Sequence, residues 1–353
     1  MTTEPAGAEI LGRKVNIAEL AAAAGVSTAT VDRILNQRGG VRQPTIDRVI
    51  LAADQLGFAL PATMRRQAPA MRLSFVLPVA NNKYLRLLAD TIRQSVEELE
   101  QYNVRCQVIP IASFNPAVLA EHLMQLAATE DGIAFMALEH PLVREAVKTL
   151  SGRGIHLLTL ISDISNAPRA AFVGMDNRSA GRTAGLLLGR FVGTSTQAGN
   201  KVVMFAGSLS YRGHEEREMG FRHILNEAYP RLEIIGLREG HDDAHSNYKI
   251  ASALLEQHPD IIGIYNVGGA SEGVARALVE ANRHQDVVFI GHGLTAETRA
   301  LLVQGTLDAV INVTPLTLMR NAVRIFNNLR EGREPTVGVE AAPIGIVLRE
   351  NLP

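Results

Sequence analysis

The chain has a single cysteine, Cys106, among its 353 residues. One cysteine excludes an intramolecular disulfide and a cysteine-based zinc site, and it fits a reducing compartment. Long apolar runs are also missing, since stretches such as 185–189 are far too short to span a bilayer. The N-terminal segment carries Glu4 and Glu9 and has no apolar stretch after a basic start, so no secretory signal is expected. These absences predict a cytoplasmic protein without a membrane partner.

Signatures of catalysis are absent as well. The sequence contains no GxSxG, P-loop or EF-hand pattern and no paired acid–base or nucleophile signature. The segment 241–245 has two histidines beside carboxylates, but capping of the helix that follows is the favoured interpretation over a metal site. The chain is therefore expected not to be an enzyme and to need no cofactor and no metal.

The composition that is present is that of a folded protein. Hydrophobic residues make up 46% and charged residues 20%, and the length suits two or three compact units. Residues 1–72 hold nine Lys or Arg and six Asp or Glu, whereas the remainder holds 26 and 30. A mildly basic head on an acidic body is compatible with a small DNA-contacting module.

Three short helical patterns lie within residues 14–58. Apolar spacing predicts helices over 16–24, 27–36 and about 43–56, with Asn16 and Ser27 at N-cap positions. The positions expected to face a shared core are Ile17, Leu20, Ala21, Val31, Ile34, Leu35, Ile46, Val49, Ile50 and Ala53. A helix, a glycine-containing turn and a second helix form a helix-turn-helix, although the spacing alone also fits a generic three-helix bundle.

The residue strings of this head favour DNA binding. VNIAELA at 15–21, AGVS at 24–27 and TVDRILN at 30–36 closely resemble the head of the lactose-repressor family, and the likeness continues to 56–58. The resemblance implies operator DNA as a partner, with a set of DNA-binding residues on or beside the second helix. In that set Thr28, Ala29 and Arg33 read bases, Ser27 and Thr30 hold the backbone, and Asn36 completes the surface.

One residue of the second helix departs from the family pattern. Asp32 stands where many members have serine. A carboxylate near phosphates weakens binding unless it accepts from a cytosine amino group or pairs with Arg33 or another arginine. The sequence leaves these alternatives open.

Residues 59–71 link the head to the body. By the family resemblance this stretch forms a hinge helix in the minor groove, where Met64 is the candidate wedge and Arg65 lines the groove or meets phosphates. Pro69 limits any such helix to about two turns. A flexible basic tether is the alternative interpretation.

Strand-like and helical patterns alternate through the body, residues 72–353. Helices are predicted in most of the gaps between the strands, for example over 84–102, 179–191, 214–228 and 271–281. Strands are predicted over 73–79, 104–109, 133–138, 156–161, 201–206, 232–237, 261–266, 287–290 and 307–313. Such alternation predicts doubly wound parallel sheets, with a ligand at the carboxyl ends of the strands. The predicted fold class is an all-α helix-turn-helix head on an α/β body of two lobes.

The body resembles the type I periplasmic sugar-binding fold of the same repressor family. The segment 173–177 resembles the crossover into the second lobe, so the first lobe is expected over about 72–176 and 308–330, and the second over 177–307 and 331–353. Arg217 stands in the segment 207–221 that supplies the effector-binding arginine, whose guanidinium clamps vicinal hydroxyls or a carboxylate. The other effector-binding residues predicted from this resemblance are Asn81, Asn82, Tyr84, Glu139, Asn266 and Asn312.

Together these patterns predict a dimeric transcription regulator, with repression the expected mode. Its operator affinity would be controlled by a small-molecule effector, a sugar or sugar derivative, between the lobes. The dimer is expected because a two-fold operator needs paired heads and no leucine heptad tail follows the last strand. The alternative is a sugar-binding protein without DNA regulation.

Overall fold

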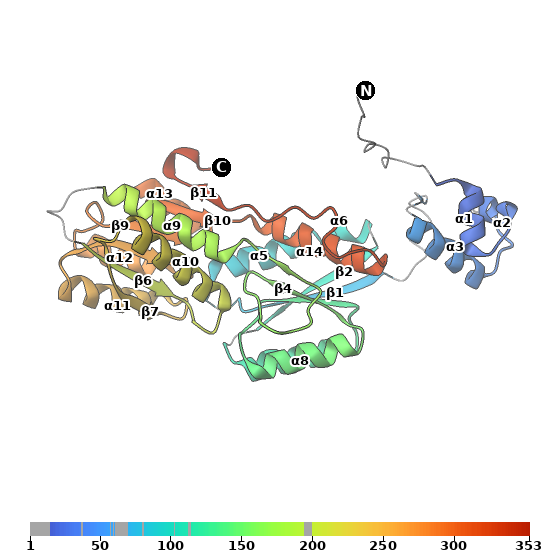
Figure 1. Ribbon diagram of the computed structural model, residues 1–353, viewed down its shortest axis with the longest axis horizontal. Coiled ribbons are helices and arrows are strands. Elements are labelled where there is room, and N and C mark those ends of the chain that lie inside the picture. Colours follow the sequence, from blue (N-terminus) through green and yellow to red (C-terminus); the bar gives the residue numbers. More distant parts are fainter. Residues whose placement is uncertain are drawn as a thin grey trace, which may run out of the picture.

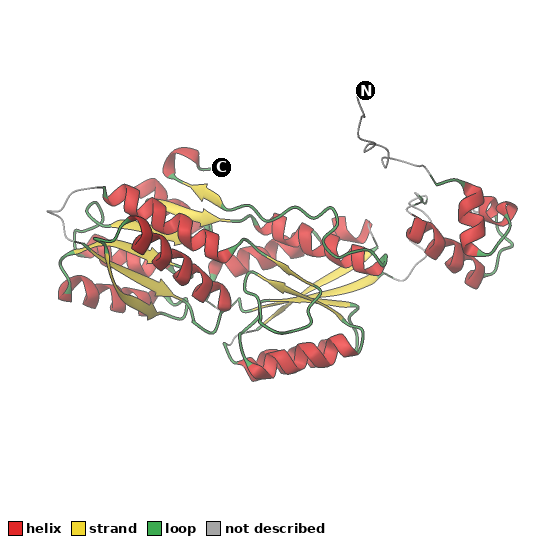
Figure 2. Ribbon diagram, in the orientation of Figure 1, coloured by secondary structure: helices red, strands yellow, loops and turns green. Residues whose placement is uncertain are grey.

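The computed structural model describes residues 15–36, 38–56, 58, 60, 70–79, 81–101, 103–111, 114–193 and 200–353. These residues form a small helical head and two α/β lobes (Figures 1 and 2). Met64 and Arg65, together with the prediction of a hinge helix, lie outside the described residues. In the described ranges, no helix is long and apolar enough to cross a bilayer.

The head consists of three helices, as predicted: α1 (Ile17–Ala24), α2 (Thr28–Leu35) and α3 (Gln43–Leu56). Asn16 and Glu19 form a reciprocal capping box at the start of α1, with N–O distances of 2.9 and 3.1 Å. Gly25 ends α1 at φ 65°, a left-handed conformation that glycine adopts without strain. The hydroxyl of Ser27 accepts from the backbone N–H of Thr30 at 3.1 Å and so begins α2.

The head has its own hydrophobic core. Leu20, Val31, Val49 and Ala53 are fully or almost fully buried within it. The prediction for Ile17 was wrong, because its side chain remains 39% exposed at the first residue of α1, outside this packed cluster.

The first lobe contains a five-stranded parallel sheet of order β2-β1-β3-β4-β5. Its strands are β1 (Met71–Leu77), β2 (Val104–Pro110), β3 (Gly132–Phe135), β4 (His156–Leu160) and β5 (Ala171–Val173). One face packs on α5 (Lys83–Gln94) and α14 (Pro315–Arg330), and the other on α7 (Pro116–Leu126) and α8 (Pro141–Gly152). Because both faces are covered, central strands such as β3 are apolar throughout.

The second lobe contains a six-stranded sheet of order β11-β10-β9-β8-β6-β7, in which only β11 runs antiparallel to its neighbour. Its strands are β6 (Lys201–Ala206), β7 (Glu233–Glu239), β8 (Ile261–Asn266), β9 (Val288–His292), β10 (Ala309–Asn312) and β11 (Gly345–Val347). One face packs on α9 (Asn177–Val192) and α10 (Arg212–Ala228). The other packs on α11 (Ala244–Gln257), α12 (Ser271–Glu280) and α13 (Ala296–Gln304), and a 3-10 turn η1 (Arg349–Asn351) follows β11.

The chain crosses between the lobes at two places that bear on the predicted boundaries. The first crossing follows Val173, the last residue of β5, and leads into α9, where the segment 173–177 was expected to cross. The return crossing comes later than expected. Residues 308–330 were assigned to the first lobe, but β10 pairs with β9 in the second sheet, and only α14 returns to pack against the first. Strand patterning does not say which sheet a strand joins, so the sequence could not place this boundary.

One helix and two short strands also differ from prediction. The helix expected over 84–102 is divided at Ser95 into α5 and α6 (Val96–Gln101). The Ser95 hydroxyl donates to the carbonyl of Thr91 at 2.9 Å, a bond that competes with the helical pattern. The short edge strands β5 and β11 were not predicted, because three residues are too few to show an alternating pattern.

Candidate functional site

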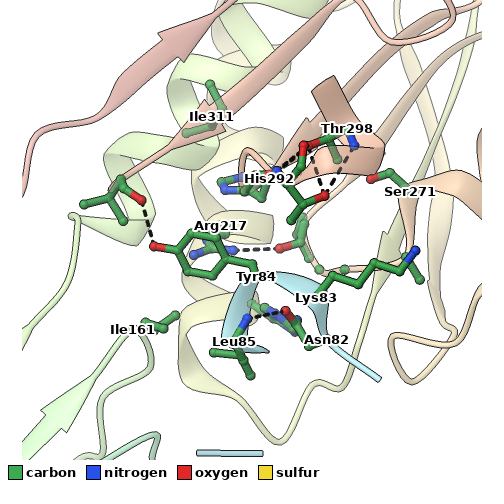
Figure 3. Close-up of a pocket in the computed structure, with 18 of the residues that line it drawn as sticks. Asn82, Lys83, Tyr84, Leu85, Ile161, Arg217, Ser271, His292, Thr298 and Ile311 are labelled. Carbon is green, nitrogen blue, oxygen red and sulfur yellow. Dashed lines mark hydrogen bonds between the residues drawn. The ribbon is translucent and has the colours of Figure 1, made fainter. Parts of the chain in front are cut away.

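A cavity of about 60 Å³ lies between the lobes, lined by residues of both (Figure 3). The first lobe contributes residues at the start of α5 and the apolar side chains of Met136 and Ile161. The second contributes residues of α10 and of the loops that follow β8 and β9. Parallel sheets are expected to bind ligands at the carboxyl ends of their strands, and this cavity lies at such a position.

Arg217 lies on α10 and places a buried positive charge in the lining of this cavity. Only 7% of the residue is exposed. Its Nε donates to the amide oxygen of Asn177 at 2.8 Å, and its Nη1 donates to the carbonyl of Val267 at 2.7 Å. Burial lowers the pKa of Arg217, because removal from water penalises the charged form. The guanidinium is thus fixed in place by neutral acceptors.

Two buried histidines lie beside this guanidinium. Nδ1 of His214 is 2.9 Å from the carbonyl oxygen of Ser208, and Nε2 of His292 is 2.7 Å from the hydroxyl of Tyr265. Burial, and then the charge of Arg217, lower the pKa of His214 to about 4 and that of His292 well below its usual value. Both rings are therefore neutral at pH 7.

The segment 82–84 of the first lobe projects into the second lobe. Tyr84 covers part of the cavity and donates its hydroxyl to the carbonyl of Val313 at 2.7 Å (Figure 3). Nζ of Lys83 is 2.8 Å from carboxylate oxygens of both Glu272 and Glu297, which lie in the first turns of α12 and α13. This segment therefore holds the lobes together at the mouth of the cavity.

Asp242 is a buried carboxylate behind this segment, in the loop between β7 and α11. Its two oxygens accept from the Nδ2 of Asn82 at 2.8 Å and from the backbone N–H of Gly269 at 2.7 Å. Its φ of 53° lies in the left-handed region, which few non-glycine residues adopt. The loop is thus fixed by a bond between the lobes.

The predicted effector residues divide into two groups. Asn82, Tyr84 and Arg217 line the cavity, whereas Asn81, Glu139, Asn266 and Asn312 do not. Glu139 pairs with Arg144 and accepts from Ser165, and the Asn266 amide holds the loop 268–271. The Asn312 side chain accepts from the backbone N–H of Leu294 at 3.0 Å. These three side chains are engaged in positioning loops, and Asn81 is exposed.

Several lining residues escaped the sequence analysis. His214 and His292 line the cavity but are not among the residues predicted to bind the effector. Lys83, Ser271 and Thr298 follow strands directly or lie at helix starts, and that position was the only signal that could have found them.

The head presents the predicted DNA-facing surface on α2. Thr28, Ala29 and Arg33 are exposed, while the Ser27 hydroxyl lies 2.8 Å from that of Thr30. Asp32 has an arginine partner within the head, which was one of the alternatives for this carboxylate. It pairs with Nη1 of Arg38 at 3.1 Å and accepts from Nδ2 of Asn36 at 2.7 Å, so its arginine partner is not Arg33.

Fold and cavity define a class of protein, namely a helix-turn-helix head joined to a two-lobed ligand-binding body. Comparison with known families agrees. Residues 73–334 match the periplasmic binding protein domain, and residues 16–59 match the bacterial regulatory proteins of the lacI family. The chain therefore belongs to the periplasmic binding protein domain family and carries a lacI-family head.

Individual relatives agree with this assignment. An HTH-type transcriptional regulator from Streptomyces limosus is 32% identical over 171 residues, 48% of this chain and 47% of that protein. The chain spans about half the length of the curated relatives it matches.

Solved structures share the fold of the body. The glucose-galactose binding protein GanP from Geobacillus stearothermophilus has a TM-score of 0.72 at 24% identity, over 81% of this chain and 100% of that chain. A solute-binding protein from Burkholderia graminis, solved with D-arabinose, has a TM-score of 0.71 at 20% identity, over 80% and 97%.

Proposed function

We propose that this chain is a transcription regulator that binds operator DNA through α2 and responds to a small effector held between its lobes. The observation that carries the proposal is the surface of α2. The helix α2 is capped by Ser27 and packs on the buried core of the head. It presents Thr28, Ala29 and Arg33 to solvent, in a segment that matches the lacI family. Short side chains at the start of a recognition helix let it approach base edges in the major groove.

The residues of the head have separate roles in this proposal. Arg33 donates to base edges, and its planar guanidinium suits a bidentate contact with guanine. Ser27 and Thr30 lie where the first turn of α2 meets the DNA backbone. Asp32 is kept from repelling phosphates by Arg38, which neutralises it. Asn36 orients the Asp32 carboxylate.

The cavity gives the effector a means of control. Its walls come from both lobes, so a ligand bound there has different contacts in the open and closed arrangements. A ligand shifts such an equilibrium only by its differential affinity for the two states. The names of the body's structural relatives favour a sugar or a sugar derivative as the effector.

Several other expectations belong to this proposal. The chain acts in the cytoplasm, as a homodimer whose paired heads match a two-fold operator. It acts by binding and performs no catalysis. The head covers residues 14–58 and the body 72–353, with the return crossing placed after β10 rather than at 308.

DNA binding is tested by fluorescence anisotropy with promoter fragments from the protein's own genome, at several salt concentrations. We expect salt-sensitive binding to a specific fragment, and Arg33→Ala should cost about 1–3 kcal/mol of discrimination. Arg86→Ala, at an exposed position of α5, removes an equal charge from the body and is the matched control. Unchanged binding by Arg33→Ala would remove this residue from the DNA interface.

A further inference from the structure

The guanidinium of Arg217 is a buried charge without a counter-ion in contact. Its two hydrogen bonds use neutral oxygens, and in the described part of the chain no carboxylate lies within 4.0 Å of it. Three of its five N–H groups have no hydrogen-bond partner among those residues. A buried charge without a partner costs several kcal/mol, so such sites usually receive an opposite charge.

The acidic groups near the cavity are engaged elsewhere. Glu272, the acidic residue in its lining, shares the ammonium of Lys83 with Glu297. Asp242 attracts Arg217 at longer range, but both of its oxygens accept from Asn82 and Gly269. The charge of Arg217 is thus offset in part and remains available to a ligand.

The remaining lining groups favour a ligand that brings its own negative charge. His214 and His292 are neutral beside Arg217, and the pKa of each is lowered partly by that charge. The other walls are largely apolar, formed by side chains that include Met136, Ile161 and Val267. No free carboxylate stands in this lining to accept from the hydroxyls of a neutral sugar.

Resting on the proposed function, we infer that the effector is anionic, a polyhydroxylated acid whose carboxylate or phosphate pairs with Arg217. The planar guanidinium can meet either group through two parallel N–H···O bonds. The cavity is lined by residues of both lobes, so an anionic group paired with Arg217 contacts both of them. The anionic group enters at Arg217, and the hydroxylated remainder lies toward Lys83 and Ser271 at the mouth.

The test compares matched neutral and anionic compounds on the full chain by thermal shift and isothermal titration calorimetry. The pairs are D-galactose with D-galacturonate, D-glucose with D-gluconate, and D-ribose with D-ribose 5-phosphate. We expect at least one anionic member to bind at least tenfold more tightly than its neutral partner. The acids and the phosphate separate the two sources of the charge.

Two variants assign the effect to Arg217. Arg217→Gln should weaken the anionic compound at least tenfold, while Arg86→Gln should not. Asn177→Asp places a carboxylate next to Nε of Arg217 and should also weaken the anionic compound, even if Arg217→Gln fails to fold.

Equal or tighter binding of the neutral partners, or no binding of any anionic member, would overturn the inference. Neither result touches the proposed function, which fails separately if the chain shows no salt-sensitive binding to its own promoter fragments.

Discussion

At the scale of single residues, the buried histidines link the cavity to acid stability. His214 has a pKa of about 4 in the folded chain, below the usual 6.5, because burial and Arg217 disfavour its charged form. Below pH 6.5 the unfolded chain takes up a proton that the folded chain refuses until about pH 4. The free energy of unfolding therefore decreases as the pH is lowered from 6.5 to about 4. The decrease is up to about 1.4 kcal/mol per pH unit for one histidine.

This pH dependence can be measured by urea denaturation at pH 7, 6 and 5. His214→Gln should make the profile less steep than that of the wild type. Parallel profiles for the wild type and His214→Gln would show that this ring does not titrate as its burial requires.

A second residue-scale prediction concerns the start of α2. Ser27→Ala removes the hydroxyl that accepts from Thr30 and should destabilise the head by about 1 kcal/mol. Ser27→Asp keeps an acceptor at the same place and should restore most of that stability. Circular dichroism during thermal unfolding would reveal the difference, and equal stability of the alanine and aspartate variants would argue against a capping role.

Residue roles could be predicted from the sequence where they depend on residues close by in the chain. Asn16 and Ser27 were predicted correctly as caps, because a cap needs only its own next few residues. Arg217 was located by its family resemblance. The histidines beside Arg217 were not predicted, since His292 reaches the cavity through long-range packing and no short motif contains it.

At the scale of elements, α9 and α10 approach each other closely enough to need glycine. A Cβ on Gly181 would collide with the backbone carbonyl of Arg217, and one on Gly220 with that of Arg178. Gly181→Ala should therefore destabilise the chain by about 1–3 kcal/mol and displace Arg217 from the cavity.

The matched control is Gly152→Ala, in α8, where an added Cβ would meet nothing within 4 Å. It should be neutral or stabilise by about 0.4–1 kcal/mol. Chemical denaturation of both variants makes the comparison, and a Gly181→Ala protein as stable as the control would contradict the close approach of these helices.

A second element-scale prediction concerns the mouth of the cavity. Lys83→Met leaves Glu272 and Glu297 facing each other without the ammonium between them, and their repulsion should loosen the contact between α5 and the second lobe. Because these groups are partly exposed, the stability cost should stay within about 0–1 kcal/mol. Backbone hydrogen exchange should nevertheless become faster at the start of α5. Lys249→Met, at an exposed position of α11, is the control for the loss of a lysine charge. Unchanged exchange in Lys83→Met would mean that the ion pairs do not hold the lobes.

Element patterns were the most predictable part of this fold. Most of the strands and helices for which the sequence predicted bounds lie within a few residues of them, because apolar periodicity survives in long elements. Besides the short edge strands β5 and β11, two features were not predicted. The division at Ser95 depends on one hydroxyl, and the membership of β10 depends on which sheet edge is open.

At the scale of the whole molecule, the proposed function requires coupling between two sites that share no residue. The head has its own core and the cavity lies between the lobes, so coupling requires that lobe closure alter how the heads meet DNA. The sequence predicted both parts but could not predict the contacts between the lobes, such as the hydrogen bond from Asn82 to Asp242, because they join residues far apart in the chain.

The most direct test of this account is the operator affinity measured with and without a compound shown by calorimetry to bind the cavity. The account predicts a change of about 5- to 150-fold in the operator Kd for the wild type, and none for Arg217→Gln at the same concentration. A compound that binds the cavity of the wild type, yet leaves its operator Kd unchanged, would contradict the central claim.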